Sequence, residues 1–504
     1  MEALRGLFAK CTREGDSKPK KGYDAIQKRL GYIGWYQLQI LLPSQLGYLA
    51  VTGFGRREWP TDRWHGEKLE FHSLMVELSI LCSGKYMTTL FSTMVMGGGI
   101  IGAFSWGYAA DRWGRKWCMM LPLSGVAIMN AILAAAGGIN LGLTLFLLFM
   151  LGTFGGGFMV TNIVFAIEAF GGQTWRLGVV SVNGWPLGMI VMALVAWLTG
   201  HWRYYHITLA IIALPIIVWT TFWTYESPRW LVQHKRLEEA HEILEKICRQ
   251  NKVRPEISMK ELQEAAAVSE KEGKAHKQYN YLDLVKYRQI LIPLLALFYS
   301  WLASAIVSFG VYFNLGSLSG NLFANQMLLG TLKGATGMIP FAICHWVGRK
   351  PILLVSASIA CLSSWAAVVI WFTAEKPRES IWLTVFAVIG AAAIDPIWKV
   401  NHLYSTELFP TVVRNMARAI CNVGSRCGSF IGPQTKYLGE LYGPAPFLIF
   451  GTLSVFHVLI SAIFLPETKG RPLPDRLPDK KGIRPVSSFE LATVQQNVSH
   501  AIVT

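Results

Sequence analysis

Long apolar segments recur along the chain and restrict its fold more than any other feature. A helix needs about 20 apolar residues to cross the hydrocarbon core of a membrane. Polar backbone groups cannot stay unpaired in lipid, so segments of this length predict membrane-spanning helices. We count twelve such windows, at 31–53, 87–109, 117–138, 141–164, 177–199, 205–223, 289–312, 322–344, 351–373, 380–403, 413–436 and 444–465.

A polar stretch separates the first six windows from the last six, so the chain divides into five parts. They are a basic tail at 1–29, a bundle of six helices at 30–223, a cytoplasmic loop with helices at 224–288, a second bundle of six helices at 289–465 and a cytoplasmic tail at 466–504. The segment LEEAHEILEKICRQ at 237–250 carries apolar residues at helical spacing. This pattern predicts an amphipathic helix that packs on the inner surface of the protein or on the membrane surface.

The charge distribution supports a membrane protein and gives its orientation. Hydrophobic residues make up 52% of the chain and charged residues 15%, whereas a soluble domain carries about 25% charged residues. The net charge is +16, and the basic residues gather in the two tails and in loops beside apolar windows. This is the positive-inside pattern, which places both termini in the cytoplasm. The same clustering argues against nucleic-acid binding.

One loop carries a motif of glycines and charged residues. It reads GYAADRWGRK at 107–116, directly after the second window. We expect Gly107 to allow close helix approach and Gly114 to permit a tight turn. Asp111, Arg112 and Arg115 can form ion pairs that close the inner face, and breaking them would let the two bundles rock. The alternative is a basic loop that serves topology alone, but topology does not require the glycine spacing.

The corresponding loop of the second half is similar but incomplete. It reads CHWVGRKP at 344–351 and keeps Gly348, Arg349 and Lys350. His345 stands where the first loop has its acid. The second loop therefore lacks the local partner for its own basic residues.

These motifs carry a family resemblance. The loop at 107–116 fits the pattern G-x-x-x-D-R-x-G-R-K at every fixed position and resembles the major facilitator superfamily. Four further stretches, over a resemblance that spans about 30–475, are similar to its organic-ion transporter family. They are EAFGGQTWR at 168–176, YESPRWLV at 225–232, STELFPTVVRN at 405–415 and LPETKGRPLPD at 465–475. Of these, YESPRWLV and the start of LPETKGRPLPD also resemble sugar porters. The resemblance implies a twelve-span all-α membrane protein with two pseudo-symmetric six-helix bundles and a substrate site between them.

The same stretches supply the expected gating residues at the inner ends of the helices, which we call the inner lock. The resemblance assigns to it Gly107, Asp111, Arg112, Gly114, Arg115, Glu168, Arg176, Glu226, Arg229, Glu407 and Arg414. Sugar porters are the nearest rival family. Their Gln-Gln pair and Gly-Pro-x-Pro-Trp stretch are missing from 297–314 and 391–404, so a glucose-like substrate is disfavoured.

Charged residues within the apolar windows are candidates for the substrate site, because a charge near the bilayer centre costs about 2.5–3.5 kcal/mol. Arg426 and Lys333 lie roughly 18 and 16 Å from the inner ends of their helices at 1.5 Å per residue. Asp395 and Lys399 are four residues apart and can neutralise each other. Arg426 and Lys333 could each pair with Asp395 instead, but one acid cannot neutralise both, which predicts surplus positive charge and an anionic group on the substrate.

The family comparison and the aromatic residues add to this expectation. At the position of Arg426, cation transporters of the family have Asp, whereas anion and carnitine transporters have Arg. Many members have an acid at the position of Lys333. Arginine suits a carboxylate through bidentate hydrogen bonds. Side chains of the seventh window would complete a substrate-binding wall, or else face lipid and neighbouring helices. They are Trp301, Ser308, Phe309 and Tyr312.

The sequence therefore predicts a transporter that moves small organic anions or zwitterions by alternating access, in the plasma membrane. An organic-cation transporter with Asp395 as the counter-charge is the first alternative. A non-transporting membrane sensor on the same fold is the second. The sequence shows no P-loop, catalytic triad or metal-ligand spacing, so we expect neither an enzyme nor a cofactor or metal. The expected partners are a small organic ion and the lipid bilayer.

Overall fold

The computed structural model describes most of the chain outside its tails and its longest loops. The described residues are 36–37, 39–40, 72–78, 85–170, 178, 181–182, 184–252, 258–275, 284, 286–343, 346–409 and 413–469. Most of the first predicted span, at 31–53, lies outside them, as does Arg176.

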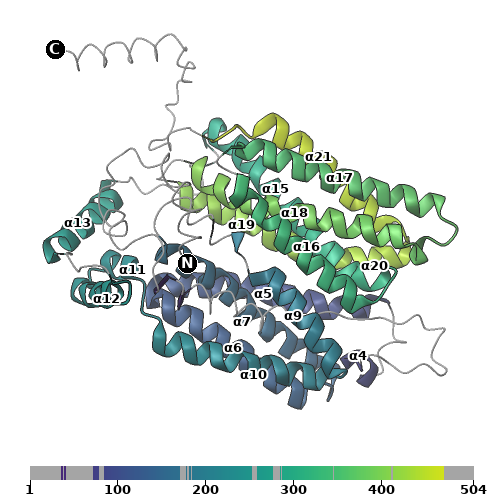
Figure 1. Ribbon diagram of the computed structural model, residues 1–504, viewed down its shortest axis with the longest axis horizontal. Coiled ribbons are helices and arrows are strands. Elements are labelled where there is room, and N and C mark those ends of the chain that lie inside the picture. The colour runs from purple at the N-terminus through teal and green to yellow at the C-terminus, as the bar shows by residue number, and fades with distance from the viewer. Residues whose placement is uncertain are drawn as a thin grey trace, which may run out of the picture.

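Helices from the two halves of the sequence form two bundles that lie side by side, one purple to blue and one green to yellow (Figure 1). The N-terminal bundle contains α4 (Leu74–Glu77), α5 (Lys85–Trp113), α6 (Arg115–Ala136), α7 (Leu141–Ala169), α9 (Gly184–Thr199) and α10 (Trp202–Trp223). The C-terminal bundle contains α15 (Arg288–Asn314), α16 (Leu322–Ile343), α17 (Arg349–Thr373), α18 (Ile381–Glu407), α19 (Arg414–Ile431), α20 (Gln434–Leu441) and α21 (Ala445–Phe464).

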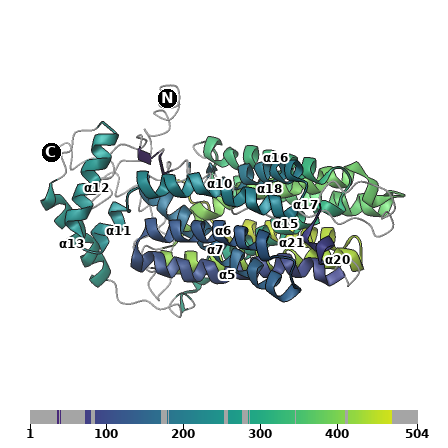
Figure 2. The ribbon, with the colours of Figure 1, turned by 90° about the horizontal axis from the view of Figure 1, so that it is seen from below.

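Three helices of the polar stretch stand at one end of both bundles. They are α11 (Pro228–Gln233), α12 (Leu237–Gln250) and α13 (Met259–Ala275), and Figure 2 shows them gathered beyond the ends of the long helices. We call this the linker end and the other the opposite end. The predicted helix at 237–250 is confirmed as α12, and it buries Ala240, Leu244 and Ile247. The amphipathic face therefore packs on the protein.

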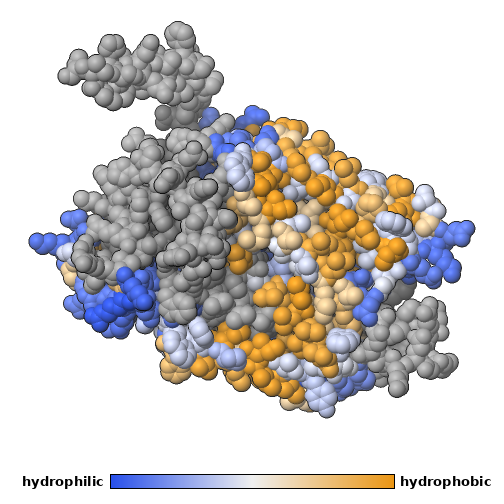
Figure 3. Space-filling view, in the orientation of Figure 1, coloured by the Kyte–Doolittle hydropathy of each residue, from blue (hydrophilic) through white to orange (hydrophobic). Residues whose placement is uncertain are grey.

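Eight of the described helices are long and apolar enough to cross a membrane, and α9 is a shorter apolar helix. Large apolar side chains on them face outward, among them Phe222, Leu362 and Ile463, which are 72%, 71% and 69% exposed. The space-filling view shows this apolar surface as an orange band between blue ends (Figure 3). A surface of this kind is stable in lipid, and the chain is a multi-pass membrane protein.

The predicted eleventh span differs from the observed helix. The window at 413–436 predicts one continuous span, but α19 ends at Ile431 and α20 begins at Gln434. Pro433 lies between them and cannot donate a helical hydrogen bond, which explains the break.

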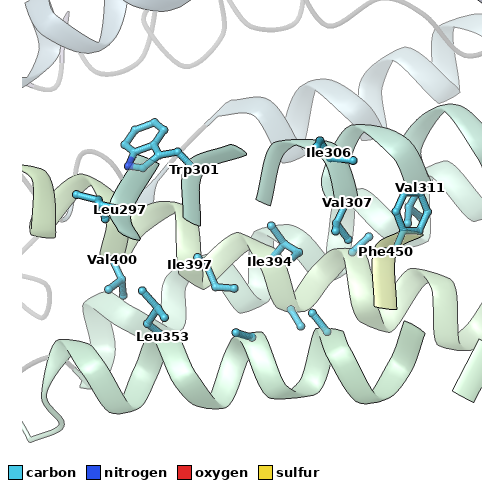
Figure 4. Packing of buried hydrophobic residues seen from close by; sticks show 14 of the residues in the cluster. Leu297, Trp301, Ile306, Val307, Val311, Leu353, Ile394, Ile397, Val400 and Phe450 are labelled. Carbon is cyan, nitrogen blue, oxygen red and sulfur yellow. The ribbon is translucent and has the colours of Figure 1, made fainter. Parts of the chain in front are cut away.

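The C-terminal bundle has a continuous apolar core. Val307 of α15, Leu353 of α17, Ile394 and Ile397 of α18 and Phe450 of α21 are all at least 95% buried. Figure 4 shows α18 with its side chains between those of α15 and α17. The charged residues of α16, α18 and α19 are therefore held on helices with a fixed arrangement.

In the N-terminal bundle, α5 and α7 pack through glycines. A Cβ atom at Gly98 would overlap the carbonyl oxygen of Phe149, and one at Gly102 would overlap that of Thr153. Small residues let helix backbones approach closely in membranes, where helix packing depends on van der Waals contact. The glycine run of the second predicted span is therefore a packing surface.

We expect Gly102→Ala to lower the free energy of unfolding by about 1–3 kcal/mol or more, because overpacking against backbone cannot be relieved by a rotamer change. Gly142→Ala is the matched control, since a Cβ there meets its nearest neighbour, Asn140 Oδ1, at 3.7 Å. Thermal unfolding of the purified proteins in detergent measures both. Equal stability of the two variants would contradict the close packing of α5 on α7.

Candidate functional site

A glutamate from the linker end of α10 holds the start of α6. Gly114 has φ 108°, a backbone conformation that favours glycine. The Oε1 atom of Glu226 accepts hydrogen bonds from the backbone N–H groups of Arg115 at 2.7 Å and Lys116 at 3.0 Å. A Cβ at Gly114 would overlap the Glu226 carboxylate. The glycine is thus required both for the turn and for the approach of the carboxylate.

The side chains beside this turn form an ion-pair cluster. Arg115 Nη1 lies 2.6 Å from Asp111 Oδ1, and Arg115 Nε lies 3.2 Å from Glu168 Oε1. The Ser227 hydroxyl donates to Glu168 Oε2 at 2.7 Å. The structure thus brings together four predicted inner-lock residues, Asp111, Arg115, Glu168 and Glu226, from α5, α6, α7 and the loop after α10.

The C-terminal bundle repeats this arrangement. Glu467 accepts hydrogen bonds from the backbone N–H groups of Arg349 at 2.9 Å and Lys350 at 3.1 Å. Arg349 Nη2 lies 3.2 Å from Glu407 Oε1, and the Thr468 hydroxyl donates to Glu407 Oε2 at 2.7 Å. Glu467 and Glu407 thus correspond to Glu226 and Glu168 of the first bundle, and Arg349 finds its acid on another helix of its own bundle.

The remaining predicted inner-lock residues are placed differently. A Cβ at Gly107 would lie 3.8 Å from Val160, an ordinary contact, so the expectation that Gly107 allows a close helix approach is wrong. Arg112 lies over the Tyr108 ring at 4.8 Å. Arg229 is half-buried on α11. Arg414 begins α19, but its side chain lies outside the described part of the chain.

The pKa values of Glu226 and Glu467, the two glutamates that accept backbone N–H groups at helix starts, shift in opposite directions. Burial raises the pKa of Glu226, although its backbone hydrogen bonds act against this. Burial also acts to raise the pKa of Glu467, but four backbone N–H groups donate to it, and together they lower its pKa. Glu226 uses Oε1 for all three of its backbone bonds. Glu467 uses both oxygens, since Lys350 N–H donates to Oε2.

Three charged side chains meet between α16 and α18 in the C-terminal bundle. Lys333 is 3% exposed and donates from Nζ to the Ser308 hydroxyl of α15 at 2.6 Å. Lys399 Nζ lies 3.5 Å from Asp395 Oδ2, and Lys333 is within electrostatic reach of both. A Cβ at Gly337 would overlap Asp395 Oδ2. The predicted pair of Asp395 with Lys399 is confirmed, and it lies beside a second lysine.

Arg426 lies on another helix and faces the N-terminal bundle. Gly424 and Gly428 of α19 pack against the backbone of α15, and Arg426 lies on the opposite side of the helix from both. Phe430 is one turn beyond Arg426 on the same face, and its ring lies 3.6 Å from where a Cβ of Gly97 on α5 would stand. Arg426 is half-buried and therefore lies at the boundary between the two bundles.

The aromatic residues of α15 divide into two groups. Trp301 makes edge contacts with Trp398 at 5.5 Å and with His402 at 4.7 Å, both on α18. Phe309 makes an edge contact with Trp185 of α9 at 6.0 Å. Tyr312 contacts the neighbouring Phe313 ring at 5.1 Å. Phe309 therefore lies at the boundary between the bundles, whereas Trp301 is buried within the C-terminal bundle.

Sequence reasoning did not single out Glu467 as a functional residue. The signal was present, because Glu226 and Glu467 each follow the last helix of a bundle and precede a hydroxyl residue, Ser227 or Thr468. In both copies that hydroxyl bonds to the second glutamate of its cluster.

We expect Glu226→Gln to be tolerated at neutral pH and Glu467→Gln to lower the melting temperature. In Glu226→Gln, the glutamine carbonyl oxygen can replace Oε1 as the acceptor of all three bonds. In Glu467→Gln, the side-chain NH₂ group would replace Oε2 and would face the Lys350 N–H, so two donors would meet without an acceptor. A lowered pKa stabilises the fold above the unfolded-state pKa, so the Glu467→Gln deficit should shrink on acidification. Glu226 has a raised pKa, so the wild type loses stability as the pH rises through that pKa. Glu226→Gln does not titrate and should therefore gain stability relative to wild type as the pH rises. Melting curves from acidic to neutral pH measure both, and parallel pH profiles would contradict the assignment.

Comparisons with known proteins agree with this geometry. A model of the family described as "Sugar (and other) transporter" matches residues 48–475. Mouse solute carrier family 22 member 3 is 30% identical, over 86% of this chain and 77% of its own length. The organic cation transporter protein of Drosophila melanogaster is 29% identical, over 81% of this chain and 74% of its own.

A solved structure supports the fold. The xylose transporter XylE from E. coli, in a partially occluded inward-open conformation, superposes with a TM-score of 0.62 at 17% identity, over 87% of this chain and all of XylE. At that identity the likeness shows the twelve-span fold alone. Together with the family match and the relatives, it makes the chain a membrane transporter. The chain belongs to the sugar (and other) transporter family of the major facilitator superfamily and, within it, to the organic-ion transporters.

Proposed function

We propose that this transporter moves small organic anions, or zwitterions that carry a carboxylate, by alternating access. The observation that carries the proposal is the charge balance in the middle of the C-terminal bundle. Among the described residues of α16, α18 and α19 there, Lys333, Lys399, Arg418 and Arg426 are basic and Asp395 is the one acid. An anionic group on the substrate would offset the surplus.

The contacts of these residues support this balance. Asp395 is already paired with Lys399 at 3.5 Å. Lys333 bonds to the neutral Ser308 hydroxyl, which satisfies one donor but supplies no negative charge. A buried cation is costly unless it meets an anion or a wet cavity. The pair formed by Asp395 and Lys399 is neutral, so Lys333 adds a positive potential to this region.

Arg426 is the residue best placed to bind the anionic group. It faces the boundary between the bundles, where the superfamily binds substrate. The packing of Gly424 and Gly428 puts Arg426 level with the part of α15 near Leu302. Ser308 is six residues further along that helix, about 9 Å at 1.5 Å per residue. An organic ion that reaches from Arg426 towards Lys333 would pass Phe309 at the same boundary.

The organic-cation alternative rests on two facts. The Drosophila relative is named an organic cation transporter, and Asp395 is available in principle as a counter-charge. For Asp395 to bind a cation, however, it must give up Lys399 while Lys333 stays nearby. The non-transporting sensor is less well supported, because both bundles retain an ion-pair cluster at the linker end.

Contacts between the bundles support alternating access. At the opposite end, Gln434 of α20 donates to Thr93 of α5 at 2.6 Å, and the Tyr86 and Tyr437 rings meet at 5.8 Å. The ion pairs between described residues at the linker end lie within one bundle or the other. We infer a state closed at the opposite end. With both termini in the cytoplasm of a plasma-membrane protein, as the basic tails suggest, that closed end is outside.

We expect Arg426→Ala to reduce uptake of an organic anion about 10-fold or more, because a hydrogen bond to a charged group contributes about 1.5–3 kcal/mol. Arg426→Lys should retain part of the activity, since the charge stays and the bidentate geometry is lost. The measurement is uptake of matched anionic and cationic tracers into proteoliposomes. Arg378→Ala is the control, because Arg378 lies in the loop before α18 and packs over Trp371.

If wild type carries the cation and excludes the anion, the organic-cation alternative replaces the proposal. Normal anion uptake by Arg426→Ala would remove Arg426 from the substrate site. Uptake of neither tracer by wild type, with both orientations of the protein present in the vesicles, would favour the sensor.

Asp111→Asn tests the inner lock. The Asp111 side chain is 70% exposed, so the substitution should leave the fold intact and slow turnover by changing the balance between conformations. Glu242→Gln is a matched control, since Glu242 forms an exposed ion pair with Lys246 at the same i,i+4 spacing on α12. We expect a lower maximal uptake rate for Asp111→Asn alone. Equal rates for the two variants would show that Asp111 has no gating role.

A further inference from the structure

Two histidines from distant parts of the sequence lie together at the opposite end of the N-terminal bundle. His72 donates its backbone N–H to Gly200 O at 2.8 Å, and Trp202 donates its N–H to His72 O at 3.0 Å. These bonds form an isolated bridge that pairs His72 with His201. The two imidazole rings are stacked, with centroids 4.8 Å apart and planes 8° apart. The backbone therefore fixes the position of both rings.

A carboxylate completes the group. Glu77 is the last residue of α4, which lies at the end of the bundle away from α11–α13 (Figure 1). The Trp202 indole N–H donates to Glu77 Oε2 at 2.8 Å, and Arg203 forms an ion pair with Oε1. Arg203 also donates to Ala134 O at 2.7 Å. The carboxylate is thus held beside the two rings, and each of its oxygens retains a lone pair.

We propose that His72, Glu77 and His201 bind a divalent transition-metal cation of the zinc class. One ligand atom from each of the three lies within 4.8 Å of the others. A tetrahedral zinc site with bonds of about 2.0–2.2 Å separates its ligand atoms by about 3.4 Å, so modest side-chain rotations would close the site. Two imidazoles and a carboxylate suit Zn²⁺, whereas Mg²⁺ and Ca²⁺ prefer oxygen ligands.

An unsatisfied atom gives independent support. The Nδ1 atom of His72 is buried and has no hydrogen-bond partner, and buried polar atoms normally have one. Coordination of a metal directly through this atom would account for it.

Two features of the site oppose the metal and keep its affinity moderate. The Nδ1 atom of His201 accepts a hydrogen bond from Arg203 N–H at 3.2 Å, and coordination through this ring would exchange that long bond for a metal bond. The Arg203 guanidinium also places a positive charge next to the cation. Its bonds to the backbone carbonyls of Ala134 and Gly137 hold it in place beside Glu77.

The site joins two segments of the same bundle. The 72–77 segment precedes α5, and His201 caps the start of α10. A bound cation would clip this segment onto α10 and stabilise the N-terminal bundle without bridging to the C-terminal one. Metal binding should therefore be insensitive to transport substrates, which makes the proposal independent of the proposed function.

Thermal unfolding of the purified full-length protein, without a histidine tag, tests the site with ZnCl₂ as the probe and MgCl₂ as the comparison. We expect a saturable rise of the melting temperature with Zn²⁺ and none with Mg²⁺. His72→Gln and His201→Asn should each weaken the apparent Zn²⁺ affinity about 10-fold or more, because loss even of an outer-shell partner of a metal ligand costs about 10–100-fold. Asparagine is a good helix N-cap and preserves an acceptor for Arg203 N–H.

His241→Asn is the matched control. His241 faces Glu245 at 3.7 Å on α12, which gives one imidazole and one carboxylate without a second ring. This variant should respond to Zn²⁺ as wild type does. If a variant is unstable without metal, the visible absorption spectrum of Co²⁺ bound to wild type tests the site instead. A spectrum typical of tetrahedral coordination supports the proposal. A wild-type protein that shows neither response, or equal Zn²⁺ shifts in wild type and His72→Gln, would overturn the proposal.

Discussion

Charge placed away from water in a membrane protein must be compensated locally, and this requirement determines how the structure is arranged. At the linker end, basic residues that follow the α5–α6 and α16–α17 turns meet carboxylates from other helices of their own bundle. Arg115 has Glu168 at 3.2 Å, and Arg349 has Glu407 at 3.2 Å. In the middle of the C-terminal bundle, Asp395 and Lys399 compensate each other. Lys333 lies beside this pair and bonds to the neutral Ser308 hydroxyl, so it adds positive charge to that region.

In both ion-pair clusters, a glutamate side chain accepts hydrogen bonds from backbone N–H groups at the start of a helix. A helix that starts directly after a glycine turn exposes N–H groups with no partner in the helix, and in each bundle a glutamate from the end of the last helix accepts two of them. The clusters differ in detail, because Glu226 uses one oxygen and Glu467 uses two. Glu226 accepts three backbone N–H groups and Glu467 four, and hydrogen bonding outweighs burial in setting the pKa only at Glu467.

The sequence predicted the features that depend on local pattern. Helix positions follow from apolar length, and α12 begins and ends at the predicted residues. The pairing of Asp395 with Lys399 follows from helical spacing. Features that depend on tertiary contact were not accessible. Gly107 was expected to pack closely and does not, whereas the close approach of α5 to α7 occurs at other glycines. The His72–His201 bridge joins segments whose distance along the chain hides any ligand spacing.

The division of ion pairs between the bundles bears on how the molecule moves. Each cluster ties together helices of one bundle and so stiffens that bundle as a unit. Within the N-terminal cluster, Arg115 is 12% exposed and Glu168 15%, but Asp111 is 70% exposed. Asp111 can therefore accept a second partner without breaking the buried pair. A helix end brought over from the C-terminal bundle would find Asp111 available, and the rest of the cluster would hold it in position. Rigid-body rocking of this kind needs fixed units and a few exposed charges at their boundary, and this cluster provides both.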